Sequence, residues 1–236
     1  MIEIEALTVE FGRVRPLDAL TACLAAPICG LIGPNGAGKT TLLNALSGFV
    51  TPVAGDIRLD GRSLLALSPR KRAQAGLRRN FQPQTVVENL TVAENVLGMA
   101  DHFCASGAQA GRESARALEF VGLGAEARTP GRRLNLLQRR LTEFARTLTG
   151  GPKLILLDEP AAGLNEHETL ALREKIAAAP AEFGAQILLI DHDVEFVASL
   201  CVETLVIDFG RRLALGPTAE VLRDPEVRRA YLGQAA

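Results

Sequence analysis

Residues 33–40 read Gly-Pro-Asn-Gly-Ala-Gly-Lys-Thr, and a second threonine follows them. This spacing fits the pattern G-x-x-x-x-G-K-[ST], in which a glycine-rich loop leads into a helix. Glycines let the backbone curl until several N–H groups point at one anion, and the start of a helix adds a partial positive charge. Lys39 would reach the outer phosphates, and the Thr40 hydroxyl would ligate Mg²⁺. The pattern predicts a nucleotide site made of Gly33, Pro34, Asn35, Gly36, Ala37, Gly38, Lys39, Thr40 and Thr41.

The sequence on either side supplies the strand and the helix that such a loop needs. The apolar run 28–32 precedes the loop and predicts a buried strand. Behind the loop, Leu42, Leu43 and Leu46 recur at helical spacing, and Gly48 is the expected C-cap. We therefore interpret the segment as a strand, a phosphate-binding loop and a helix rather than as an ordinary glycine-rich turn.

A second buried strand, predicted over the apolar run 154–157, ends in the adjacent acids Asp158 and Glu159. Ligands of open α/β sheets bind beyond the carboxyl ends of the strands, so we expect both carboxylates at the nucleotide site. Asp158 would hold Mg²⁺, directly or through water, and Glu159 would polarise the attacking water as a general base. Two acids after a strand are common as helix caps, but their combination with the loop favours catalysis.

Two weaker signals complete the candidate site. His192 follows a third apolar run, 187–190, so the same geometry would place its imidazole near the γ-phosphate. Gln82 follows a short basic helix that begins near residue 69, and its amide could ligate Mg²⁺, although a single glutamine is a weak indication. His102 and His167 have no such placement, and we interpret both as surface residues.

The composition fits an intracellular α/β protein. The 236 residues carry 26 Lys and Arg against 27 Asp and Glu, a net charge of −1 that gives no overall field for nucleic acid. Apolar residues make up 47% of the chain, enough for a substantial core. The four cysteines lack metal-binding spacing, so we expect buried thiols in a reducing compartment. Without a signal peptide or an apolar run of about 18 residues, we expect a soluble, cytosolic protein.

Around these segments the chain divides into two kinds of structure. Residues 2–11 alternate in polarity and predict an antiparallel edge strand, ahead of a turn region at 12–18. From about 91 to 149, strand-like runs give way to Ala-rich helical patterns, which predicts a helical lobe inserted into a sheet domain. The other expected elements are a strand at 57–59 entering a hairpin turn, hairpin strands 204–208 and 211–215, and closing helices 219–222 and 225–232.

The motifs occur in the order seen in ATP-binding cassette (ABC) ATPases: the phosphate loop, Gln82, Asp158-Glu159 and His192. The chain resembles this family over essentially its whole length. It is most similar to the branch that takes up branched-chain amino acids and urea, the LivG-like subunits. The narrower likeness rests on residues 79–82, 87–95 and 158–165 and on the tail from 216 to 233. The lipopolysaccharide-export ATPases share part of the pattern.

This resemblance implies an α/β fold: a P-loop ABC ATPase core with an antiparallel β subdomain and an inserted helical lobe. A single domain would span 1–236, with the core at 1–90 and 150–236 and the lobe at 91–149. The chain would bind ATP and Mg²⁺ and hydrolyse ATP, as a cytoplasmic subunit peripheral on the inner face of the cell membrane. The resemblance also implies that Phe11 stacks on adenine; from the sequence alone, Phe11 could equally be a core residue of its strand.

The partners implied by the resemblance are other proteins of a transporter. They are a second, non-identical ABC ATPase subunit, two membrane permease subunits and, indirectly, a periplasmic solute-binding protein, with no nucleic acid. We expect part of the apolar set Val86, Val87, Leu90 and Val92 to line a groove for a helix of a membrane subunit. The sequence does not name the solute, because importers of this family read it on the binding protein and the membrane subunits.

One segment departs from the family pattern. The family signature, Leu-Ser-Gly-Gly-Gln or a variant that keeps the second glycine, should precede the strand at 154–157, but residues 134–138 read Leu-Asn-Leu-Leu-Gln. In the family, the signature faces the γ-phosphate held by the other subunit of a head-to-tail dimer. Leu136 and Leu137 carry branched side chains where close approach needs none, and Asn135 lacks a hydroxyl. We therefore expect an intact phosphate loop beside a degenerate signature.

Two alternatives stay open beside an importer ATPase. The degenerate signature favours a binding-only or regulatory ABC-type ATPase with little turnover, whereas Glu159 and His192 argue for hydrolysis. A lipopolysaccharide-export ATPase would share part of the motif set. A soluble ABC-type ATPase of translation or DNA maintenance is disfavoured, because this sequence shows no paired cassettes, long coiled coils or strongly basic appendages.

Overall fold

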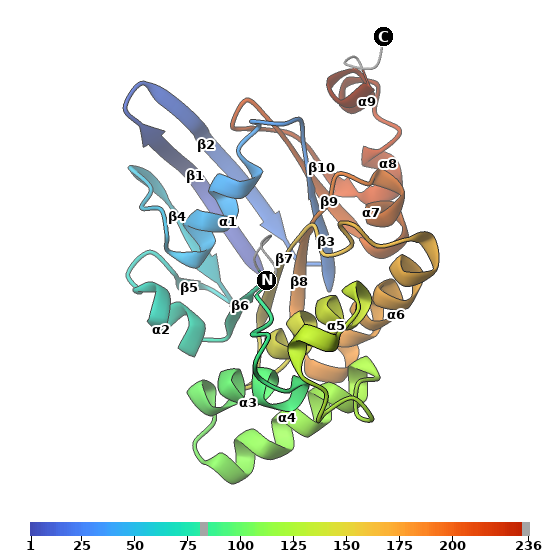
Figure 1. Cartoon of the computed structure of the whole chain (residues 1–236). Coiled ribbons are helices and arrows are strands. Elements are labelled where there is room, and N and C mark those ends of the chain that lie inside the picture. Colours follow the sequence, from blue (N-terminus) through green and yellow to red (C-terminus); the bar gives the residue numbers. More distant parts are fainter. Residues whose placement is uncertain (81–84, 233–236) are drawn as a thin grey trace. The chain divides into compact units, whose positions relative to one another are not determined.

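The computed structural model describes residues 1–80 and 85–232 (Figure 1). The chain forms two compact units, one made of residues 1–77 and the chain from 186 onward, the other of residues 78–185. Gln82 lies outside the described residues, so its expected role stays a prediction. The boundaries expected for core and lobe also stay predictions.

The first unit contains an antiparallel sheet of four strands in the order β2-β1-β4-β5. Its strands are β1 (Ile2–Phe11), β2 (Val14–Leu24), β4 (Ala54–Leu59) and β5 (Arg62–Ser63). Because β1 pairs with β2 on one side and β4 on the other, the prediction of an edge strand is wrong. Register shifts in the β1–β2 pair, with positive φ at Ala6 and Ala19, interrupt the alternation that would have revealed β2.

A second set of strands in the first unit has the order β10-β9-β3-β8. These are β3 (Ile28–Ile32), β8 (Gln186–Ile190), β9 (Glu203–Asp208) and β10 (Arg211–Pro217). β3 is buried throughout and pairs in parallel with both β8 and β9, which explains its continuous apolar run. β9 and β10 form the expected antiparallel hairpin.

The helices of the first unit are α1 (Lys39–Ser47), α2 (Pro69–Gln74), α7 (Val194–Leu200), α8 (Thr218–Val221) and α9 (Pro225–Leu232). Among them, α2 and α7 begin at the capping side chains of Ser68 and Asp193. As expected, α1 ends at Gly48 in the left-handed conformation. The buried Arg72 of α2 donates hydrogen bonds to the carbonyls of Ala45 and Leu46, at the C-terminal end of α1. Burial lowers the pKa of Arg72.

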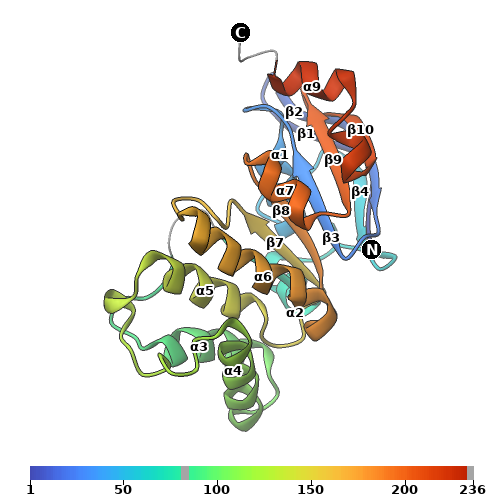
Figure 2. The ribbon, with the colours of Figure 1, turned by 90° about the vertical axis from the view of Figure 1, so that its right-hand side faces the viewer.

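The second unit is mostly helical (Figure 2). Its elements are β6 (Leu77–Arg79), α3 (Val92–Phe103), α4 (Gly107–Val121), a short 3₁₀ helix (Gly131–Arg133), α5 (Leu136–Thr147), β7 (Leu154–Asp158) and α6 (Glu166–Phe183). Helices α3, α4 and α5 pack on one another, and α5 also packs on α6. The N–H of Asn80 donates to the carbonyl of Leu156, which joins the end of β6 to β7.

The expectations for the cysteines and for membrane-spanning helices can be compared with the described residues. Of the four cysteines, Cys29 and Cys201 are buried, Cys104 is half-buried and Cys23 is exposed, so the expectation of buried thiols holds for two. Burial raises the pKa of Cys29 and Cys201 to about 12, which keeps both thiols protonated at neutral pH. No helix in the described part of the chain is long and apolar enough to span a membrane.

Candidate nucleotide site

The phosphate-binding loop follows β3 and leads into α1, as the sequence predicts. A Cβ atom on Gly33 would lie 2.1 Å from the carbonyl oxygen of Ile207, and one on Gly38 would lie 2.3 Å from that of Pro16. Gly38 also has a φ of 107°, so neither position accepts a larger residue. The backbone of the loop therefore packs closely against the backbone of Ile207 and Pro16.

Lys39 lies across this loop. Its Nζ donates to the carbonyl oxygen of Gly33 at 2.6 Å and to that of Pro34 at 2.9 Å. Among the described residues, no side chain caps the N-terminus of α1. A glycine cradle, a lysine and a helix N-terminus together fit a chain of phosphates. Thr40 is exposed, as a hydroxyl that ligates Mg²⁺ must be.

His192 lies at the same edge of the sheet as the phosphate loop. Leu31 of β3 pairs with Ile190 of β8 in parallel register, so Gly33 and His192 each follow two residues later. The side chain of His192 is 74% exposed, and its Nδ1 lies 3.5 Å from a carboxylate oxygen of the buried Asp191. That placement suits a donor to a bound nucleotide, and its role stays a prediction.

Phe11 ends β1, where it pairs with Val14. Its side chain is 53% exposed, so it is not a core residue of the strand. An exposed ring of this kind could stack on a base, but no ligand contact tests that role.

Asp158 ends β7 and is held by residues that the sequence reasoning did not assign a role. Its N–H donates to Oδ1 of Asn80 at 2.9 Å, and its Oδ2 lies 3.5 Å from Nη2 of Arg79. Both members of this ion pair are more than nine-tenths buried, and burial lowers the pKa of Arg79 against the opposing effect of the Asp158 carboxylate. The signal that could have identified them was two polar residues just ahead of Gln82.

Glu159 has a φ of 49°, in the left-handed region that a non-glycine residue seldom adopts. Its carbonyl accepts a hydrogen bond from the N–H of Ala162 at 3.2 Å, which closes a turn directly after β7. Such backbone strain, of order 1–3 kcal/mol, occurs disproportionately at functional sites. It therefore supports the catalytic role expected for this carboxylate.

The degenerate signature forms the start of α5. Asn135 caps the helix: its Oδ1 accepts from the N–H of Gln138 at 2.8 Å, and Oε1 of Gln138 accepts from the N–H of Asn135. Leu136 packs on Gly163, since a Cβ built there would lie 3.2 Å from its Cδ2. Arg140 donates to the carbonyl of Ala162 at 3.0 Å. Helix α5 thus packs against the turn that follows Glu159 and is hydrogen-bonded to it.

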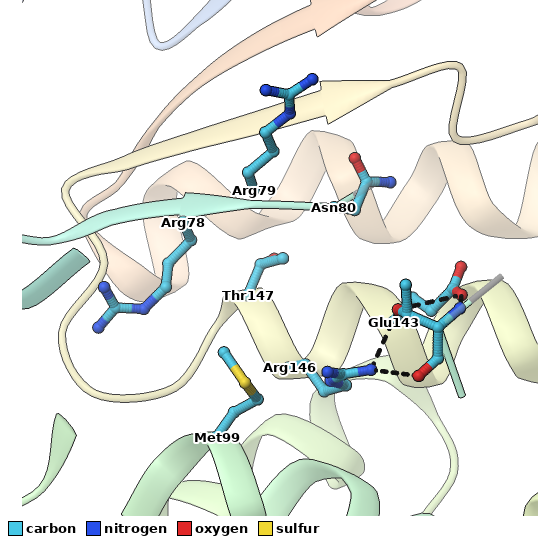
Figure 3. A pocket seen from close by; sticks show the side chains of 8 residues that line it. Arg78, Arg79, Asn80, Met99, Glu143, Arg146 and Thr147 are labelled. Carbon is cyan, nitrogen blue, oxygen red and sulfur yellow. Dashed lines mark hydrogen bonds between the residues drawn. The ribbon is translucent and has the colours of Figure 1, made fainter. Parts of the chain in front are cut away.

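A cavity of about 270 Å³ opens elsewhere in the second unit (Figure 3). It is lined by Arg78, Arg79, Asn80, Thr85, Met99, Glu143, Arg146 and Thr147. Arg78 stacks on Phe103 and donates to the carbonyls of Thr149 and Gly150. Burial lowers the pKa of Arg78 to about 10, so that Arg78 stays charged at neutral pH, and burial also lowers the pKa of Arg146. The described lining holds three arginines, Arg78, Arg79 and Arg146, against one acidic side chain, Glu143, so its net charge is positive.

The predicted site residues are divided between the two units. The phosphate loop, Phe11 and His192 belong to the first unit, whereas Asp158, Glu159 and the signature belong to the second. Within the first unit, β3 and β8 bring the loop and His192 to one sheet edge. Within the second, α5 contacts the segment after Glu159.

Comparison with known proteins decides the family. Residues 22–162 match the family model described as ABC transporter. The chain is 36% identical to the high-affinity branched-chain amino acid transport ATP-binding protein BraF of Pseudomonas aeruginosa, and 34% identical to LivG of Escherichia coli K12. Both alignments cover 100% of this chain and 98% of the relative. The chain belongs to the ABC transporter family.

Matches to solved structures show the fold, and a second family model matches the C-terminal residues. A nucleotide-free ATP-binding cassette from an ABC transporter matches with a TM-score of 0.87 and 24% identity, and the cassette MJ1267 with 0.87 and 25%. Each covers 98% of both chains. The expected ABC ATPase fold is confirmed, and the chain is an ATP-binding transport ATPase of this family. Residues 211–236 match a second model, described as a branched-chain amino acid ATP-binding cassette transporter.

Proposed function

We propose that this chain is the ATP-hydrolysing subunit of an importer for branched-chain amino acids or related small solutes. The observation that carries the proposal is the match of the tail, residues 211–236, to the branched-chain amino acid model. The full-length likeness to BraF and LivG supports it. The lipopolysaccharide export protein LptB of Acidithiobacillus ferridurans is 34% identical over 94% of this chain, and that likeness fits the shared cassette.

In the proposed mechanism, the backbone of the phosphate loop binds the phosphates of ATP. Lys39 leaves the carbonyls of Gly33 and Pro34 and turns to the β- and γ-phosphates, while Phe11 stacks on adenine. Thr40, Gln82 and Asp158 would hold Mg²⁺, which neutralises charge on the phosphates. Glu159 takes a proton from the attacking water, and His192 donates to the γ-phosphate.

The assembly follows from the degenerate signature. We propose that the chain works on the cytoplasmic face of the membrane with two permease subunits and a second, non-identical ATPase subunit that supplies an intact signature. A solute-binding protein in the periplasm would deliver the solute. In such a dimer, this chain's phosphate loop, Asp158, Glu159 and His192 would face the partner's signature and form one complete site.

The basic cavity is the proposed point of coupling to the membrane subunits. Of the apolar set expected there, Val86 and Val92 are buried and fill the core, whereas Val87 and Leu90 are 49% and 38% exposed. Val87 lies two residues after Thr85, which lines the cavity. Exposed apolar side chains that follow a lining residue of this cavity in the sequence would suit a short amphipathic helix that carries an acidic residue.

Reconstitution tests this function. The chain, a second ATPase subunit with an intact signature and two permease subunits are placed in proteoliposomes, and uptake of labelled leucine is measured with ATP on the side of the ATPases. We expect ATP-dependent uptake in the presence of the binding protein, and ATP hydrolysis well above that of the chain alone. Hydrolysis without uptake of any branched-chain amino acid would contradict the solute assignment. Equal hydrolysis with and without the second ATPase would contradict the proposed assembly.

A further inference from the structure

A second hollow of the helical unit is bounded by α3, α4 and the segment that follows α4, where the two helices lie side by side (Figure 2). Its volume is about 340 Å³. Its described lining shares no residue with the arginine-lined cavity or with the predicted nucleotide site. It is lined by Ala93, Leu97, Gly111, Ser114, Ala115, Leu118, Glu119, Gly124 and Ala127. Because most of these residues are alanine, leucine or glycine, the hollow suits an aliphatic group.

The lining positions on α4 form one face of the helix. Gly111, Ala115 and Glu119 recur at intervals of four residues, so their side chains lie above one another. From Gly111 to Glu119 this face runs for about 12 Å. A Cβ atom built on Gly111 would meet no atom within 4 Å outside its own stretch of the helix backbone. The hollow is therefore elongated along α4 and open beside Gly111.

Ser114 is a buried polar residue in this lining. It is only 4% exposed, and its hydroxyl makes no hydrogen bond to the residues that the structure describes. Other buried hydroxyls on helices are paired, as in Ser47, which donates to the carbonyl of Leu43. A buried hydroxyl without a partner costs free energy, so its presence calls for an explanation. A ligand that forms a hydrogen bond with Ser114 would provide one.

The end of the hollow at Glu119 favours a positive charge. Glu119 belongs to the last turn of α4, which carries no basic residue, and a helix C-terminus has partial negative charge. A Cβ atom on Gly124 would lie 2.6 Å from Oε2 of Glu119, so only glycine leaves room for the carboxylate there. Within the described residues, Glu119 forms no ion pair and no basic side chain lines the hollow. An ammonium group would be stabilised by both the carboxylate and the helix terminus.

We propose that this hollow binds a small aliphatic amine that carries a second, uncharged hydrogen-bonding group. The ammonium group donates to the Glu119 carboxylate, and the second group pairs with the Ser114 hydroxyl. These two residues are about 7.5 Å apart along the axis of α4, a distance that an extended chain of about six carbon atoms spans. The second group is uncharged because an unpaired charge beside the apolar lining would lose its hydration.

The inference goes beyond the proposed function and does not depend on it. The hollow lies wholly within residues 78–185, and none of its described lining residues is assigned a part in nucleotide binding or hydrolysis. A ligand held between α3 and α4 would stabilise the packing of these two helices, because it binds the folded chain and not the unfolded one.

Calorimetric titration of the full chain with 6-aminohexan-1-ol tests the two polar contacts, with hexylamine and hexan-1-ol as comparison ligands. Wild type should bind the amino alcohol most tightly. Removing either polar group should raise Kd about threefold to tenfold, because each removal loses one hydrogen bond and keeps the aliphatic chain. In Ser114→Ala, the amino alcohol and hexylamine should bind equally. In Glu119→Gln, the amino alcohol should lose its advantage over hexan-1-ol. Glu113→Gln is the matched control, since Glu113 lies on α4 and does not line the hollow.

A second variant tests the hollow itself. Gly111→Leu places a side chain in the open space, so Kd for 6-aminohexan-1-ol should rise about tenfold or more. Leucine favours a helix more than glycine does, so Tm should be kept or raised. Gly98→Leu is the control, because Gly98 lies on α3 in equally open surroundings and does not line the hollow. ATP binding equal to that of wild type in both variants would show that the chain is folded.

Three results would each overturn the inference. They are a wild-type chain that does not bind the amino alcohol, a Gly111→Leu variant that binds it like wild type, and hexan-1-ol bound as tightly as the amino alcohol. Equal loss of binding in Gly111→Leu and Gly98→Leu would also overturn it, because the ligand would then bind outside the hollow.

Discussion

Lys39 supplies the full positive charge that the phosphate loop presents to a ligand. Lys39→Ala removes that charge and its hydrogen bonds, which for charged partners contribute about 1.5–3 kcal/mol. We therefore expect the Kd for ATP, measured by calorimetry, to rise roughly 10- to 150-fold while the fold is kept. Lys153→Ala, which changes an exposed lysine ahead of β7, should bind like wild type. An unchanged affinity in Lys39→Ala would remove this residue from the site.

Glu159 can be tested separately from binding. Glu159→Gln keeps the size of the side chain and loses its basicity, so hydrolysis should fall about 10²–10⁴-fold, the usual worth of a general base. Bound ATP should accumulate and favour a closed dimer, which filter binding and size-exclusion chromatography would detect. Glu166→Gln, at the exposed start of α6, is the matched control. A normal rate in the complex assembled with its partner would show that Glu159 is not the base.

The residues around Asp158 show where sequence reasoning stops. A strand ending in Asp-Glu can be predicted from the apolar run before it, because parallel strands bury both faces. The partners of Asp158 cannot be predicted in this way. Arg79 and Asn80 lie 79 and 78 positions before it in the sequence, and they meet it only because β6 lies beside β7 in the sheet. The electrostatic surroundings of the carboxylate proposed to bind Mg²⁺ are therefore partly set by Arg79, a residue that is remote from it in the sequence.

At the scale of elements, the contacts at the start of α5 determine which substitutions can restore the family signature without loss of packing. Because Leu136 packs on Gly163 and Asn135 caps the helix, the full replacement Asn135→Ser, Leu136→Gly and Leu137→Gly would also loosen that packing. Asn135→Ser with Leu137→Gly keeps both the cap and Leu136. One preorganised donor is worth about 10²–10³ in rate, so we expect the isolated chain to gain about tenfold or more in ATPase activity.

The repaired signature must be assayed at concentrations that allow dimerisation, with Asn135→Ser alone as the control. Serine caps helices about as well as asparagine, so this control separates the hydroxyl from the space made at Leu137. If the wild-type chain alone already hydrolyses ATP briskly, the signature at 134–138 works despite its side chains. The alternative of a binding-only subunit would then be excluded as well.

The elements themselves were predictable where local signals are strong. The strand before the phosphate loop, α1 with its Gly48 cap, α2 with Pro69 at its first position and the β9–β10 hairpin all match expectation. β2 was missed because Pro16 and Asp18 interrupt its pattern and a left-handed Ala19 shifts its register. Its existence depends on pairing with β1 rather than on its own alternation.

At the scale of the whole molecule, the exposed pair Val87 and Leu90 gives a test of coupling. Val87→Glu and Leu90→Glu place charge on the surface proposed to contact a membrane-subunit helix, so leucine uptake in proteoliposomes should fall while ATP binding is kept. Val202→Glu is the control, because Val202 is 64% exposed and lies in the other unit. Transport retained by both variants would contradict the proposed groove.

Assembly is the level that the sequence predicts least. The motifs identify the cassette, and the degenerate signature is the basis for our proposal of a partner that carries an intact one. The exposure of Phe209 was not foreseen, because a phenylalanine in a turn resembles an ordinary hairpin residue until its backbone angles and its surroundings are known.

Arg72 affects the electric field at the nucleotide site from the far end of α1. The peptide dipoles of this nine-residue helix leave partial negative charge at Ala45 and Leu46, about 13 Å from its N-terminus. A buried guanidinium compensates that charge, because it donates to both carbonyls and is shielded from solvent. The negative charge at the C-terminal end of α1 then cancels less of the positive potential at its N-terminal end. The potential that acts on an incoming polyanion is therefore more positive. A side chain that never approaches the ligand thereby contributes to its long-range attraction.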